Sequence, residues 1–125
     1  MDKSYKLLII DDNEETLKML HAFFGKKNYE VASSLSGLDG LKLFESDKKG
    51  FDLVITDLVM PNISGVAVIS IIKKKNPATP VIAITGWGEH PESLASEANA
   101  DLILSKPLQF DELEVFVVDL LSRKK

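Results

Sequence analysis

Several acidic and polar residues end or follow short apolar segments of the chain, and together they could support phosphate chemistry. They are Asp11, Asp12, Asp57, Thr85 and Lys106. Clustered carboxylates repel one another unless a cation joins them, and oxygen ligands suit Mg²⁺. A carboxylate beside such a metal can accept a phosphoryl group as an acyl phosphate. The residue types therefore indicate Mg²⁺-assisted phosphoryl transfer to Asp57, with Lys106 and Thr85 stabilising the phosphate, if the fold brings them together.

The apolar segments themselves predict the strands of a parallel sheet. Nearly continuous apolar runs suit strands that are buried on both faces. Such runs lie within residues 6–11, 51–57, 80–85 and 101–104, with a weaker candidate at 29–33. Apolar residues at helical spacing separate these runs, so the chain is predicted to form five β-α units with helices on both faces of an open sheet. Ligands of such sheets bind at the carboxyl ends of the strands, where the polar residues fall.

Local signals mark the ends of three predicted helices. Asp12, with Glu15 three residues later, resembles a capping box at the start of the first helix. Ser36 is placed to cap the second helix. Gly25 is expected to end the first helix, and Asn76, which precedes a proline, the third.

Length, charge and cysteine content exclude several classes of protein. The 125 residues fit one domain, which we expect to span residues 1–125. The net charge of −4 argues against direct nucleic-acid binding, which needs a basic surface. The absence of cysteine excludes disulfides, thiolate nucleophiles and Cys-zinc sites. No signal-peptide core or membrane-spanning run is evident, so we expect a cytoplasmic protein with no membrane contact.

In their order, the motifs resemble those of the response-regulator receiver domain of two-component signalling. The resemblance covers essentially the whole chain, and its motifs are Asp11-Asp12, Asp57, Met60-Pro61 with Gly65, Thr85-Gly86, Asn99-Ala100-Asp101 and Lys106-Pro107. It implies an α/β fold of the flavodoxin-like, doubly wound kind. The expected sheet has five parallel strands in the order 2-1-3-4-5, flanked by five helices.

The resemblance also implies a phosphoacceptor and a metal site. Asp57 would accept the phosphoryl group. Asp12 and Asp57 would bind Mg²⁺ directly, Asp11 would bind it through water, and the backbone carbonyl of Val59 would be a further ligand.

The remaining roles concern the phosphoryl group after transfer. Lys106 would pair with one phosphate oxygen, and Thr85 would hydrogen-bond another in the active state. The bond between Lys106 and Pro107 would be cis, which is uncommon even before proline.

Three positions depart from, or vary within, the family pattern. Ile103 stands where the family usually carries Tyr or Phe, so the aromatic residue that accompanies the threonine switch is absent. Trp87, two residues after Thr85, and Val59, two residues after Asp57, could restrict water and lengthen the phosphoryl lifetime. For Trp87, a partly exposed loop aromatic is an equally weighted interpretation.

The predicted function is a phosphoacceptor switch that assists its own phosphorylation and dephosphorylation but is not otherwise an enzyme. Its donor would be a histidine kinase or phosphotransfer protein. Output would pass to a downstream protein target or to an effector domain absent from this chain. Val115 and Val118 on the last helix raise the possibility of a homodimer.

Two alternatives remain open. The first is a receiver-like interaction module that acts without phosphorylation, although such a module has no need for the acidic cluster. The second is a metal-dependent phosphohydrolase with Asp57 as nucleophile. It would need a general acid or base beside the nucleophile, which Val59 cannot supply.

Overall fold

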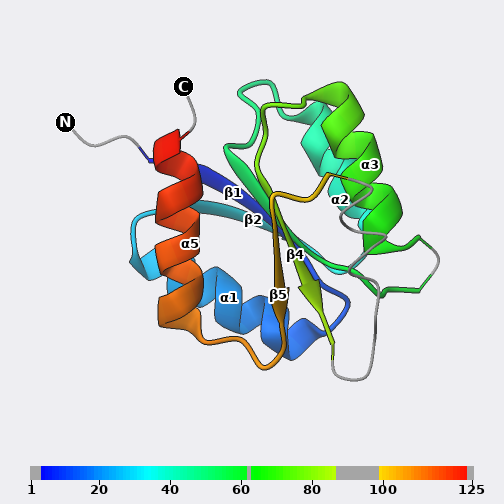
Figure 1. The fold of residues 1–125 in the computed structure, drawn as a ribbon. Helices are drawn as coiled ribbons and strands as arrows, with labels where there is room; N and C mark the ends of the chain where they lie inside the picture. The colour runs from blue at the N-terminus through cyan, green and yellow to red at the C-terminus, as the bar shows by residue number, and fades with distance from the viewer. Residues whose placement is uncertain (1–3, 62, 87–98, 124–125) are drawn as a thin grey trace.

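The computed structural model of the chain describes residues 4–61, 63–86 and 99–123, and these form a parallel sheet flanked by helices (Figure 1). The five strands lie in the order β2-β1-β3-β4-β5, as expected. They are β1 (Lys6–Ile10), β2 (Glu30–Ser34), β3 (Leu53–Asp57), β4 (Val81–Thr85) and β5 (Leu102–Ser105). Each of the predicted strands is present, with bounds that differ by one or two residues.

The described residues contain four helices rather than the five expected. They are α1 (Glu14–Lys26), α2 (Gly37–Ser46), α3 (Gly65–Lys75) and α5 (Phe110–Arg123). The connection from β4 to β5 includes residues 87–98, which lie outside the described residues. No helix in the described part of the chain is long and apolar enough to cross a membrane.

Helices cover both faces of the sheet, with α1 and α5 on one face and α2 and α3 on the other (Figure 1). Alternate residues of β1 point to opposite faces. Leu7 and Ile9 therefore pack with Phe24 of α1 and Val117 of α5, whereas Leu8 packs in the cluster that contains residues of α3. This double coverage explains why the strand sequences are apolar without alternation.

The start of α1 differs from the prediction. Asn13, not Asp12, is the N-cap, and its side chain accepts a hydrogen bond of 2.9 Å from the backbone N–H of Thr16. The predicted capping box of Asp12 and Glu15 is therefore wrong. Asn13 has the extended backbone that an N-cap requires, so the helix begins one residue later than expected.

Of the other predicted helix ends, one is wrong and two are confirmed. Gly25 does not end α1, which continues to Lys26, and the chain turns at Asn28, whose φ of 72° is in the left-handed region. Ser36 caps α2 by accepting from Asp39 N–H, and Asn76 is the C-cap of α3, as predicted.

Candidate functional site

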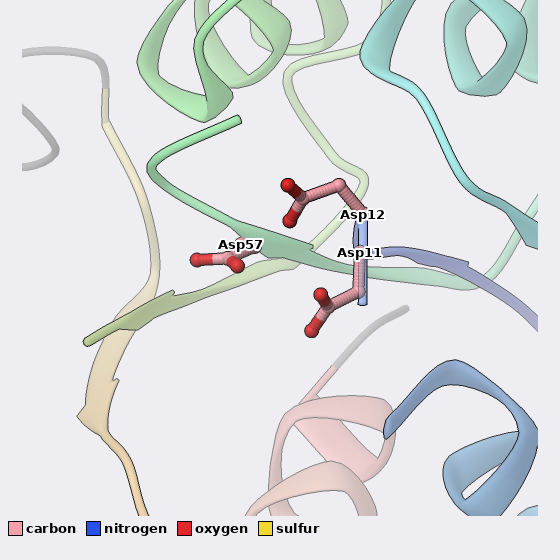
Figure 2. A group of neighbouring side chains, drawn as sticks. All are labelled: Asp11, Asp12 and Asp57. Carbon is pink, nitrogen blue, oxygen red and sulfur yellow. The ribbon is translucent and has the colours of Figure 1, made fainter. Parts of the chain in front are cut away.

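Three carboxylates meet at the carboxyl ends of β1 and β3 (Figure 2). Asp11 and Asp12 follow β1, and Asp57 is the last residue of β3. The two strands are neighbours in register, with Ile10 opposite Thr56, so the residues that follow are brought side by side. One oxygen from each carboxylate lies within 4.8 Å of the others. Residues 45 positions apart in the sequence thus form one acidic cluster.

Burial raises the proton affinity of two of these carboxylates. Asp11 is 1% exposed and Asp57 is 4% exposed, whereas Asp12 is exposed to solvent. Burial raises the pKa of Asp11 and the pKa of Asp57, because the charged form loses its hydration. At Asp11 a backbone N–H of Asn13, 2.8 Å from Oδ1, opposes this rise without cancelling it.

Lys106 provides the positive charge of the site. Its Nζ lies 3.2 Å from Oδ2 of Asp57 and 3.9 Å from Oδ2 of Asp11. Burial lowers the pKa of Lys106, but the charges of Asp57 and Asp11 raise it further than burial lowers it, so the side chain stays protonated. The residue follows β5, and its backbone N–H donates to the carbonyl of Thr85 at 2.9 Å. The following peptide bond, to Pro107, is cis.

Thr85 ends the neighbouring strand β4. The strand pairs with β3 so that Ile84 lies opposite Asp57, which places Thr85 one residue further along the same edge. The side chain is 2% exposed, and Oγ1 has no hydrogen-bond partner within the described residues. A buried hydroxyl without a partner is costly and is uncommon in native structures. It is available to a ligand at this edge.

The loop after Asp57 is held against the start of α3. The backbone N–H of Gly65 donates to the carbonyl of Leu58 at 2.8 Å. A Cβ atom at position 65 would lie 1.9 Å from the carbonyl oxygen of Asp57, which is backbone and cannot move aside cheaply. Gly65 is therefore required by close packing against the backbone of Asp57. Val59, in the same loop, is 48% exposed, and its N–H lies 3.5 Å from Oδ1 of Asp57.

The donor set fits a divalent cation. Oδ2 of Asp11 is buried and has no hydrogen-bond partner within the described residues, and Lys106 supplies one positive charge against three carboxylates. Oxygen donors with an open, solvent-facing member such as Asp12 suit Mg²⁺, which keeps several of its waters. The residues present are therefore compatible with the expected ion.

Two predicted residues remain, Ile103 and Trp87. Ile103 lies on β5, half-buried against the cluster that packs under α2 and α3. Trp87 lies outside the described residues. Asn13 was missed as a site residue, although asparagine directly before an acidic helix start is a common N-cap signal. Its N–H and its side chain position Asp11 and α1 together.

Comparison with known proteins agrees with this arrangement. The model of the response regulator receiver domain matches residues 7–117. Among curated relatives, the transcriptional regulatory protein GlrR of Escherichia coli K12 is 33% identical over 122 residues, which are 97% of this chain and 27% of the relative. The response regulator SaeR of Staphylococcus aureus is 28% identical over 95% of this chain and 51% of its own length. The chain thus spans about a quarter to a half of these relatives.

Two solved structures are similar over almost their full length. A response regulator receiver domain protein of Clostridium thermocellum is 32% identical with a TM-score of 0.89, and 96% of each chain is covered. The response regulator TrrA of Thermotoga maritima, solved in complex with Mg²⁺-BeF, is 34% identical with a TM-score of 0.83, covering 93% of this chain and 98% of that one. The strand order, the acidic edge and these matches agree, and the chain belongs to the response regulator receiver domains.

Proposed function

We propose that the chain is a phosphoacceptor switch of two-component signalling in which Asp57 accepts the phosphoryl group. The observation that carries this assignment is the position of Asp57, buried at the end of β3 with Lys106 3.2 Å away and two further carboxylates beside it. Membership of the receiver family supports the switch function. The choice of Asp57 within the cluster is our inference from that geometry.

The transfer can be written with its bonds balanced. A carboxylate oxygen of Asp57 attacks the phosphorus of a phosphohistidine, the phosphorus–nitrogen bond breaks, and the imidazole leaves and takes up a proton from solvent. Lys106 stays protonated and pairs with a phosphoryl oxygen, because its pKa is raised by the neighbouring carboxylates. Positioning and charge stabilisation are the main requirements of such a reaction.

The metal ligands are proposed from the same cluster. Asp12 and Asp57 would hold Mg²⁺ directly, with Asp11 acting through water and the carbonyl of Val59 as a further ligand. When bound, the ion would neutralise the charge of the entering phosphoryl group. The complex of the relative TrrA with Mg²⁺-BeF supports a metal in this family.

Thr85 is proposed as the residue that senses phosphorylation. Its buried hydroxyl has no partner within the described residues and would donate to a phosphoryl oxygen. That bond would favour one of two pre-existing conformations of the output surface. Ile103 occupies the position where the family usually carries an aromatic residue that moves with the threonine. The conformational change would therefore rely on Thr85 without an aromatic partner.

The partners and organisation are also proposals. Residues 1–125 would form a single receiver domain, completed by a fifth helix between β4 and β5, and would act in the cytoplasm. A histidine kinase or phosphotransfer protein would donate the phosphoryl group. Output would pass through protein contact, either to a downstream target or to an effector domain. Val115 and Val118, which are 65% and 50% exposed on α5, would contribute to a homodimer.

Intact mass measurement after incubation with acetyl phosphate and Mg²⁺ tests the acceptor. We expect one phosphoryl adduct that requires the metal, is lost in Asp57→Asn and is kept in Asp119→Asn, which changes an exposed carboxylate of α5. An adduct that survives in Asp57→Asn would assign a different acceptor.

Two further results would favour the alternatives. Failure to form an adduct, together with failure to bind beryllium fluoride, would support an interaction module that acts without phosphorylation. Repeated turnover of phosphate esters would support a phosphohydrolase. We expect an adduct, because Asp57, the acidic cluster and Lys106 are all in place. We expect no repeated turnover, because within the described residues no general acid or base lies beside Asp57 apart from the acidic cluster and Lys106.

A further inference from the structure

A fully buried threonine directly precedes the candidate acceptor on β3. Thr56 is 0% exposed, and its side chain lies on the face of the sheet that α2 and α3 cover, because side chains alternate along a strand. Val54 and Leu58, the neighbours on that face, are apolar members of one core cluster. A hydroxyl is costly in such surroundings unless it makes a hydrogen bond. The Thr56 hydroxyl therefore needs an acceptor within the fold.

That acceptor is the backbone carbonyl of Asp57. Thr56 Oγ1 donates to the carbonyl oxygen at 3.0 Å. The same peptide unit carries the N–H of Leu58, which donates to the carbonyl of Ile84 on β4 at 2.9 Å. The peptide that follows the acceptor is therefore held at both ends, its oxygen by a side chain and its N–H by the neighbouring strand.

The start of α3 packs against the same peptide. A Cβ atom at position 65 would lie 1.9 Å from the carbonyl oxygen of Asp57 and 2.6 Å from Cα of Leu58. The N–H of Gly65 also donates to the carbonyl of Leu58 at 2.8 Å. The Thr56 hydroxyl and the first residue of α3 thus both constrain the orientation of the Asp57 carbonyl.

The orientation of this peptide determines how the chain leaves β3 towards the acidic cluster. The N–H of Val59 lies 3.5 Å from Oδ1 of Asp57, and the Val59 carbonyl is a proposed metal ligand. A tilt of the preceding peptide would move both of these groups relative to the Asp57 carboxylate. Groups that orient metal ligands in this way commonly affect metal affinity as strongly as some ligands do.

We propose that Thr56 is a positioning residue for the reaction of Asp57. Its hydroxyl fixes the peptide after the acceptor, and thereby holds the Asp57 carboxylate and the Val59 carbonyl in the arrangement that binds Mg²⁺ and accepts the phosphoryl group. Thr56 acts through the backbone of Asp57 rather than by contact with the metal or the phosphoryl group. The inference rests on the proposed function.

The chain offers a matched control in a second fully buried threonine. Thr79 is also 0% exposed, but its hydroxyl has no hydrogen-bond partner within the described residues. It precedes β4, at the opposite end of the sheet from Asp57. Valine has the shape of threonine without the hydroxyl, so Thr56→Val and Thr79→Val remove the same group from equally buried positions.

Two measurements compare these variants with the wild type. Calorimetric titration gives the Kd of Mg²⁺, and intact mass with acetyl phosphate at saturating Mg²⁺ gives the rate of adduct formation. We expect Thr56→Val to bind Mg²⁺ about tenfold more weakly and to form the adduct about tenfold more slowly. Thr56→Ser keeps the hydroxyl and should keep both values near those of the wild type, as should Thr79→Val.

A spectroscopic signature reports the hydrogen bond itself. The NMR signal of the Asp57 carbonyl carbon should move in Thr56→Val, which lacks the donor, and should stay in place in Thr56→Ser and Thr79→Val. Urea unfolding checks that each variant is folded under the conditions of the measurements. Thr56→Ala is a second variant without the hydroxyl, and it should share the losses of Thr56→Val.

Several outcomes would overturn the role of Thr56. One is an unchanged Mg²⁺ Kd and adduct rate in folded Thr56→Val or Thr56→Ala. Equal losses in Thr56→Val and Thr79→Val, or in Thr56→Val and Thr56→Ser, would assign the effect to core packing instead of the hydroxyl. Absence of Mg²⁺ binding to the wild type would also overturn it. Absence of the adduct in a wild type that binds Mg²⁺ would refute the proposed function, whereas the Mg²⁺ titration would still decide the role of Thr56.

Discussion

The ammonium nitrogen of Lys106 lies 3.2 Å from Oδ2 of Asp57, so the candidate phosphoacceptor is already paired with a cation in the unphosphorylated protein. Lys106 follows β5 and Asp57 ends β3, with β4 between them. The pairing offsets part of the cost of burying the Asp57 carboxylate. In the proposed transfer, the same ammonium would pair with an oxygen of the phosphoryl group on Asp57.

Removal of this cation should change the proton affinity of the acceptor. In Lys106→Met, the pKa of Asp57, already raised by burial, should rise further, because the charge that opposes the rise is lost. Carbon-detected NMR titration of the aspartate carboxyl groups measures this. Lys27→Met removes a charge that pairs instead with Glu114 and should leave the pKa of Asp57 unchanged. An unchanged pKa in Lys106→Met would contradict the arrangement.

The lifetime of the phosphoryl group should depend on Val59 and Trp87 together. Val59 is 48% exposed two positions after Asp57 and offers no polar group to water from its side chain. The double variant Val59→Asn, Trp87→Glu should lose its phosphoryl group about tenfold faster, which corresponds to about 1.4 kcal/mol in the barrier. Decay of the intact-mass adduct measures the rate. Slower loss in the variant than in the wild type would refute this role.

Magnesium should stabilise the fold through the acidic cluster. An ion that binds only the folded state at a concentration of 100 Kd adds about 2.7 kcal/mol. We expect thermal unfolding of the wild type to shift upward with Mg²⁺, and Asp12→Asn to lose most of that shift. Asp39→Asn, which changes an exposed carboxylate on α2, should keep it. Equal shifts in both variants would place the ion elsewhere.

Close packing against the backbone of Asp57 should make position 65 intolerant of any side chain. Gly65→Ala would bring a Cβ atom to 1.9 Å from the Asp57 carbonyl oxygen, and we expect a loss of about 2–3 kcal/mol in the free energy of unfolding. Gly25→Ala is the matched control, since nothing lies within 4 Å of the added carbon in α1. It should stabilise by about 0.5–1 kcal/mol. Urea unfolding of both variants checks this contrast.

The ion pair between Lys6 and Asp47 should contribute pH-dependent stability. The Lys6 hydrogen bond lowers the pKa of Asp47 in the folded state. Its contribution is therefore present above the unfolded value of about 3.9 and is lost as the pH falls through the lower folded value. Urea unfolding between about pH 2 and 6 should show that the free energy of unfolding falls less steeply with acid in Asp47→Asn than in the wild type.

At alkaline pH the same ion pair contributes stability through Lys6, with the opposite dependence on pH. The Asp47 hydrogen bond raises the pKa of Lys6, so its contribution is present below about 10.4 and is lost as the pH rises through the folded value. Lys6→Met should lack this loss. Asp119→Asn, at an exposed pair within α5, serves as the control and should behave like the wild type at both extremes.

The strands, and the meeting of Asp11, Asp12 and Asp57 at one edge of the sheet, were predictable from the order of residues alone. Strands buried on both faces need continuous apolar runs, and these runs stand out between polar connections. Asp57 and Thr85 each end such a run, so parallel alignment was enough to predict that they share an edge. The strand order followed from resemblance to a family rather than from these patterns.

Only the three-dimensional fold decided which carboxylates of the site are buried and which residues they contact. Asp11 and Asp12 are adjacent and chemically identical, yet one is buried and the other is exposed. Asp11, directly after β1, is still held to the sheet by its N–H, which donates to the Ser34 carbonyl of β2, whereas Asp12 lies one residue further along the chain. Asn13, rather than Asp12, caps α1, because Asn13 has the extended backbone of an N-cap and its side chain accepts a hydrogen bond from Thr16 N–H. The outer position of β2 in the described sheet likewise depends on which strands pair, not on the sequence of β2 itself. Sequence patterns record which residues prefer burial, whereas distances and pairing arise from contacts between segments far apart in the chain.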